Sequence, residues 1–87
     1  MAAKTASKLY STGTAGRKTA LYVVPNVSTS DTADISTDFT AVYLAVEVAD
    51  LNAALTATTL TPATNLVLSE AAVSGQDVFV LVIGASA

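Results

Sequence analysis

The chain has 87 residues, which is enough for one small domain with a single hydrophobic core. It is 52% hydrophobic and 13% charged, with a mean hydropathy of +0.56, and it contains no cysteine and no histidine. This composition excludes disulfides, thiolate metal sites, cysteine nucleophiles and a histidine general base. The apolar run "VFVLVIGA" at 78–85 is much shorter than a membrane-spanning helix, so we expect no membrane span.

The charges are segregated along the chain. The four cations lie within the first 18 residues, and the seven anions all lie beyond residue 30. This order predicts a basic N-terminal arm over residues 1–18 and a single acidic β domain over residues 19–87. The arm is expected to be a solvated tail or to dock on an acidic surface of another subunit. Nucleic acid is not an expected partner, because so few cations on an acidic body attract phosphate weakly.

The stretch "STGTAGRKTA" at 11–20 comes closest to a phosphate-binding motif. A P-loop has four residues between its glycines and a lysine directly after the second one. Here Gly13 and Gly16 are two residues apart, and Arg17 stands before Lys18. Strand-like segments flank the stretch at 8–12 and 18–24, so we predict a hairpin turn and no nucleotide site.

The middle of the chain alternates between polar and apolar segments. Residues 27–38, "VSTSDTADISTD", predict a polar loop, because Ser, Thr and Asp compete for backbone hydrogen bonds. Its aspartates do not have the spacing of a calcium loop. Residues 39–49 predict a strand with an aliphatic face (Val42, Leu44, Val46 and Val48) and a mixed face (Ala41, Tyr43, Ala45 and Glu47).

The last part of the chain predicts further strands. Residues 50–60 are mixed, with a possible helical turn capped by Asp50 that the following threonines oppose. Residues 64–69 predict a short strand, and residues 78–83 a strand buried on both faces. About five to seven short strands without a long helix predict an all-β fold, a small antiparallel β-sandwich or barrel with an extended N-terminal arm.

No catalytic, cofactor or metal site is predicted, and we expect a protein that is not an enzyme. The serine and threonine hydroxyls lack a suitable base, and Glu47 and Glu70 belong to a chain too small for a sugar cleft. The residues expected to bind a partner are cations of the arm and two tyrosines: Lys4, Lys8, Arg17, Lys18, Tyr10 and Tyr22.

The basic start "MAAKTASKLYSTGTAGRK", the acidic β body and the hydrophobic end "VFVLVIGASA" give a chain that resembles the small capsid decoration proteins of bacteriophages, also called cement or head-stabilisation proteins. The resemblance implies a virion protein, assembled in the host cytoplasm, that binds and stabilises a finished capsid shell. Its implied partners are the major capsid protein or other virion subunits, and its implied state is a homo-oligomer, with a trimer favoured.

The residues themselves point the same way, because excess apolar surface in a small domain is typical of proteins that bind other subunits. Two alternatives stay open at this point. One is a small β module that binds carbohydrate or peptide, and the other is a different phage component, such as a tail or fibre subunit.

Overall fold

The computed structural model describes residues 3–14, 16–28, 31–49, 56–60, 64–68 and 76–87. Within these ranges the chain forms nine strands and no helix, which confirms the all-β prediction. Accordingly, this described part contains no helix with the length and apolar character needed to cross a membrane.

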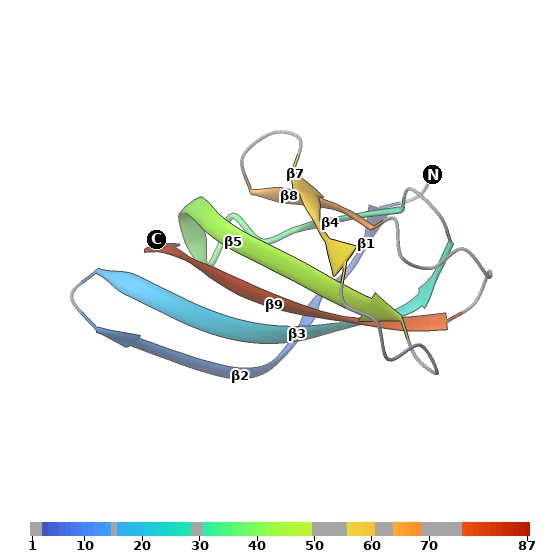
Figure 1. The fold of residues 1–87 in the computed structure, drawn as a ribbon, viewed down its shortest axis with the longest axis horizontal. Coiled ribbons are helices and arrows are strands. Elements are labelled where there is room, and N and C mark those ends of the chain that lie inside the picture. Colours follow the sequence, from blue (N-terminus) through green and yellow to red (C-terminus); the bar gives the residue numbers. More distant parts are fainter. Residues whose placement is uncertain (1–2, 15, 29–30, 50–55, 61–63, 69–75) are drawn as a thin grey trace.

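The strands form two sheets, which we call the large and the small sheet (Figure 1). The large sheet is antiparallel and has the order β2 (Ser7–Thr14), β3 (Arg17–Val27), β9 (Gln76–Ser86), β5 (Phe39–Ala49) and β6 (Thr56–Ala57). The small sheet has the order β1 (Ala3–Lys4), β4 (Asp31–Asp34), β8 (Asn65–Leu68) and β7 (Thr59–Leu60). In the small sheet, β1 runs parallel to β4 and the other pairs are antiparallel.

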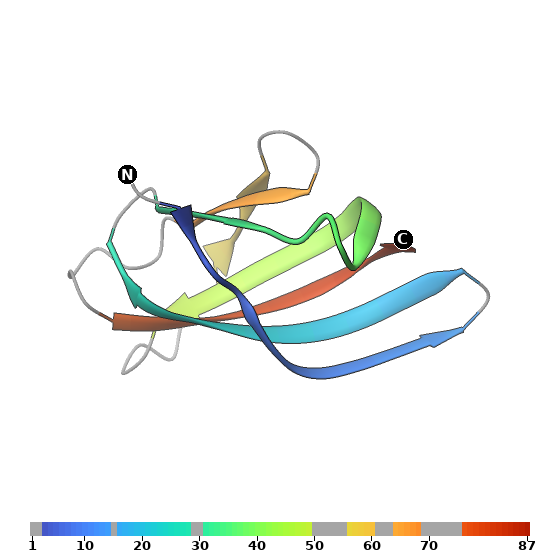
Figure 2. The same ribbon diagram turned by 180° about the vertical axis from the view of Figure 1, so that it is seen from behind.

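The core lies between the two sheets, on the face of the large sheet that we call the inner face. The small sheet covers one side of the large sheet in both views (Figures 1 and 2). Side chains of both sheets form one buried cluster, with Val78, Val80 and Val82 from β9 and Leu66 and Leu68 from β8 all fully buried. The opposite side of the large sheet is the outer face.

The predicted hairpin around "GTAG" is confirmed. Strands β2 and β3 pair antiparallel from Ser7 with Val23 to Thr14 with Arg17, and Gly16 in the turn has a φ of 79°. A positive φ favours glycine because it has no Cβ. The predicted arm boundary at residue 18 falls inside β3, and residues 3–14 contribute β1 and β2 to the two sheets.

Two of the predictions about single segments are wrong. Residues 27–38 are not a loop throughout, because they contain β4. The core contacts of Ala33 and Ile35, both 1% exposed, outweigh the turn preference of the surrounding Ser, Thr and Asp residues. Residues 78–83 are buried on one face only, since Phe79 and Leu81 on the outer face are 37% and 38% exposed.

A bulge changes the predicted faces of residues 39–49. The register of β5 against β9 shifts between Val42 and Leu44, so Val42 lies opposite the inward-facing Gly84. From Leu44 onward the alternation holds, and the aliphatic side is the outer face. The short strand predicted at 64–69 is confirmed as β8. Asp50, which was weighed as the cap of a helical turn, and Glu70 lie outside the described residues.

Candidate protein-binding face

The outer face of the large sheet is covered by apolar side chains from neighbouring strands. Because β3, β9 and β5 are in register, these side chains form rows across the sheet. The rows are Leu21, Leu81 and Val46; Val23, Phe79 and Val48; and Ile83 with Leu44, beside which β3 contributes the polar Thr19. Tyr10 on β2 extends the first row, since it pairs with Leu21. The result is a continuous apolar surface that spans four strands.

This surface is exposed to solvent in the single chain. Leu44 is 44% exposed, and Tyr10 at the edge is 60% exposed. With Phe79 and Leu81 also more than a third exposed, the central rows have no covering layer among the described residues. Scattered apolar residues are normal on protein surfaces, whereas large contiguous apolar patches are typical of interaction sites.

The local sequence explains why this face is apolar. Strands β9 and β5 consist largely of Val, Leu, Ile and Ala at successive positions, so both of their faces are apolar. Successive side chains of a strand point to opposite faces of the sheet. A strand that is apolar on both faces therefore needs a covering layer on each side to be fully buried. The small sheet supplies that layer on the inner face only.

Two opposite charges lie at the two ends of the outer face. Arg17 begins β3 and pairs with Ala85, whereas Asp77 lies near the start of β9 and accepts a hydrogen bond from the Asn26 N–H. The eight-residue offset between Asp77 and Ala85 along β9 corresponds to about 26 Å. Among the described residues of β2, β3, β5, β6 and β9, Arg17 and Asp77 are the charged side chains on this face.

A second cluster of polar residues centres on Asp38, at the turn before β5. Its carboxylate accepts hydrogen bonds from the Tyr22 hydroxyl at 2.7 Å and from the Nζ atoms of Lys8 at 3.0 Å and Lys18 at 3.1 Å. Lys18 also lies over the Phe39 ring, 5.8 Å from its centroid. The cluster ties β2 and β3 to the turn that enters β5.

The surroundings of Asp38 stabilise its charged form. The hydrogen bond from Tyr22 is the largest influence, and those from Lys8 and Lys18 add to it, so the pKa of Asp38 falls to about 2 in spite of partial burial. Burial, followed by the hydrogen bond to Asp38, raises the pKa of the Tyr22 hydroxyl above its ordinary value. At neutral pH the cluster therefore contains an ionised carboxylate and a neutral phenol that donates to it, and these groups connect β3 to the turn before β5.

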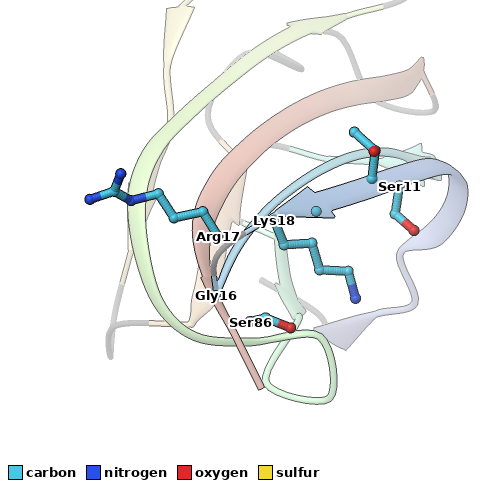
Figure 3. Close-up of a pocket in the computed structure, with 7 residues that line it drawn as sticks. Ser11, Gly16, Arg17, Lys18 and Ser86 are labelled. Atoms are coloured by element: carbon cyan, nitrogen blue, oxygen red, sulfur yellow. The ribbon is translucent and has the colours of Figure 1, made fainter.

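The hairpin that resembles a phosphate site holds a cavity of about 410 Å³, lined by Ser11, Thr12, Gly13, Gly16, Arg17, Lys18 and Ser86. Its two cations do not converge on this space (Figure 3). Adjacent residues of a strand point to opposite faces, and Arg17 extends away from Lys18, which is bound to Asp38. A phosphate site needs donors that point at one ligand, and this geometry separates them.

The other aspartates of residues 27–38 also interact with groups of their own chain. Asp31 accepts a hydrogen bond from the Ser28 N–H, and its carboxylate is 3.9 Å from Lys4 Nζ. Asp34 accepts hydrogen bonds from both the N–H and the hydroxyl of Ser36. In the described part of the chain, no three acidic side chains gather as metal ligands would.

The structure brings together only part of the predicted partner-binding set. Lys8, Lys18 and Tyr22 meet at Asp38, and Tyr22 is 1% exposed. Arg17 and Tyr10 are exposed at the margin of the outer face, and Lys4 lies beside Asp31 in the small sheet. The apolar rows themselves were missed by the site prediction, although the unbroken run at 78–83 carried the signal.

No protein-family model, no curated protein and no solved structure matches this chain. The function is therefore inferred from the outer face, its charges and the composition of the sequence.

Proposed function

We propose that this protein is a non-catalytic structural subunit of a virion, of the capsid-decoration kind, that binds and stabilises an assembled shell. The observation that carries the proposal is the apolar outer face formed by rows such as Leu21, Leu81 and Val46, in which Leu81 is exposed and its two neighbours are partly buried. Burial of such a face against another protein is favourable, and the free energy gained grows with the apolar area removed from water.

The mechanism is linkage between binding and assembly. A subunit that binds only the assembled shell stabilises it by about 2.7 kcal/mol per site when its free concentration is a hundred times its dissociation constant. Many identical sites on one shell multiply this gain. The whole effect requires a binding surface and no reacting group, which agrees with a face whose central rows are aliphatic and aromatic.

A carbohydrate or peptide module is less well supported by the positions of the exposed tyrosines. Tyr10 and Tyr43 are 60% and 63% exposed, but they lie on β2 and β5, with β3 and β9 between them. A sugar or peptide groove would require such aromatics to converge on one ligand.

The test is sedimentation of the purified protein with capsids of the source virus, intact or dissociated into subunits. We expect the protein to sediment with intact shells and to raise the temperature at which they come apart. Leu81→Asp should lose attachment, because it places a charge in the central row of the outer face.

Val67→Asp is the matched control, since Val67 is a half-buried valine of β8 that pairs with Thr32 in the small sheet. It introduces the same charge far from the apolar rows and should leave attachment intact. Equal attachment by the wild type and by Leu81→Asp would refute the role of the outer face.

A further inference from the structure

We infer that the outer face binds a second copy of this chain, in a twofold dimer whose strands run antiparallel across the interface. This inference rests on the proposed function: the outer face joins two copies, the pair attaches to the shell, and a variant that disrupts the face loses attachment because it loses the pair. Three features of the face support it: the placement of its charges, the symmetry of its apolar rows and its area.

The charges select the orientation of the second copy. Arg17 and Asp77 lie at opposite ends of the face, on the adjacent strands β3 and β9. A twofold axis parallel to the strands would bring Arg17 against Arg17 and Asp77 against Asp77. An axis perpendicular to the strands instead places each Arg17 beside Asp77 of the other copy. Like charges at an interface are unfavourable and opposite charges fix its register, so the antiparallel arrangement is selected.

The apolar rows are arranged about the same axis. Leu81 lies midway along β9 between Asp77 and Ala85, which is the residue paired with Arg17. An axis through the Leu81 row therefore brings Leu81 against Leu81 of the second copy, and Ile83 against its Phe79. Beside Ile83 the face has a hollow of about 290 Å³, lined by Thr12, Gly13, Arg17, Thr19 and Ile83. Phe79 is the largest side chain of the central rows and fits this hollow.

The area of the face is sufficient for a specific interface. Strands about 4.8 Å apart and a length of about 26 Å give a surface of roughly 500 Å² over β2, β3, β9 and β5. Two such faces bury about 1,000 Å² in total, which is the lower limit for a specific protein–protein contact. Sheet faces covered by apolar side chains pack against each other, as the two layers of a β-sandwich do.

The dimer also suits attachment to a shell. β2 is the terminal strand of the large sheet, so its outer edge lies at the margin of the dimer interface and is available to a shell, while the small sheet takes part in neither contact. A twofold particle presents every remaining surface twice. Two linked contacts hold more tightly than one, since the second forms at a high effective concentration.

The test uses charge reversal at the two ends of the face, with the dimer dissociation constant measured by sedimentation equilibrium. Arg17→Asp alone and Asp77→Lys alone should each weaken the dimer by roughly tenfold or more, because each places like charges together at both ends of the interface. An equimolar mixture of the two variants should form a heterodimer close to wild-type affinity, since every contact is then between opposite charges.

The mixture also controls for folding, because Asp77→Lys loses the hydrogen bond from Asn26 and a heterodimer can form only if both variants fold. A wild-type dimer that neither single variant weakens would overturn the antiparallel arrangement. A trimer, or a wild-type monomer that still sediments with shells, would overturn the inference and leave the proposed function standing. A dimer with these charge effects that ignores intact shells would support the inference and refute the proposed function.

Discussion

The inner and outer faces of the large sheet differ in the size of the apolar side chains that β9 and β5 place on them. A simple rule would put the largest apolar side chains inside, and these two strands do the opposite. On β9 the inner face carries Val78, Val80, Val82 and Gly84, whereas the outer face carries Phe79, Leu81, Ile83 and Ala85. On β5 the inner face carries Ala45, Glu47 and Ala49, and the outer face carries Leu44, Val46 and Val48. At these positions of β9 and β5 the larger apolar side chains point away from the core, whereas the large buried side chains of the inner face, Tyr22 and Phe39, come from β3 and the start of β5.

The difference follows from the space that is available to side chains on each face. At these positions of β9 and β5 the inner face lies in the core, where close packing limits the volume of each side chain. At Gly84 an added Cβ would overlap the Ala41 carbonyl oxygen, and it would approach the Phe39 ring to 3.0 Å. The outer face has no such limit within the single chain, and its larger side chains provide more apolar area for a partner to bury.

The difference between the two faces is tested most strongly by placing the same charge at adjacent positions of β9, one on each face. Val80→Asp should unfold the protein, because Val80 is fully buried and an unpaired charge there costs several kcal/mol. Leu81→Asp should leave a folded chain that is destabilised by about 1–2 kcal/mol, since Leu81 is 38% exposed. Circular dichroism and urea unfolding measure both effects. Equal loss of structure in the two variants would mean that both faces are core.

At the end of β9 we expect a smaller difference in stability between substitutions on the two faces. Gly84→Ala should destabilise the fold by about 2–3 kcal/mol, because the added methyl group overpacks a site closed by the backbone of β5. Ala85→Ser, one residue along on the outer face, should change stability by less than about 0.5 kcal/mol. Thermal unfolding of the two variants gives the comparison, and a neutral Gly84→Ala would show that the bulge in β5 moves aside freely.

The Asp38 cluster predicts a modest dependence of stability on acid. The pKa of Asp38 is about 2 in the folded chain and lies at its ordinary value of 3.8 when the chain unfolds. Because the folded pKa is the lower one, the cluster stabilises the fold above about pH 4, and this contribution is lost as the pH falls through 2. We expect it to be about 1–2 kcal/mol, allowing for partial exposure to solvent.

Urea unfolding at several pH values tests this expectation, with Asp38→Asn as the comparison. The wild type should lose its advantage over Asp38→Asn between pH 4 and pH 2. Tyr22→Phe should move this loss to higher pH, because the Tyr22 hydroxyl is the largest influence on the Asp38 carboxylate. An advantage that persists unchanged at pH 2 would mean that the carboxylate does not stabilise the fold.

The fold class was predictable from the sequence because, in the longest segments, the local residue pattern favours the same strands that the core packing requires. The hairpin at residues 8–24 has turn glycines between two strand-like runs, and β8 is a short apolar run between polar residues. β4 was missed because it is held in place by core contacts of Ala33 within the strand and of Ile35 directly after it. Such contacts are not visible in a local pattern of Ser, Thr and Asp.

The candidate site was predictable only in part. The sequence indicated excess apolar surface, but it did not show that the excess lies on one face of one sheet. A run such as "VFVLVI" has the same alternation whether one face or both are buried, and the register of its neighbours decides. The arm cations were assigned to a partner, and the structure places an aspartate of the same chain beside Lys4, Lys8 and Lys18.

The most direct test of the account is the reactivity of a single thiol on the outer face. The chain has no cysteine of its own, so Leu81→Cys and Val67→Cys each introduce one reporter, on the outer face and on the small sheet. We predict that alkylation of the cysteine at position 81 slows as protein concentration rises or intact shells are added, while that at position 67 stays constant. Alkylation at position 81 that is equally fast under all these conditions would contradict the claim that protein covers the outer face.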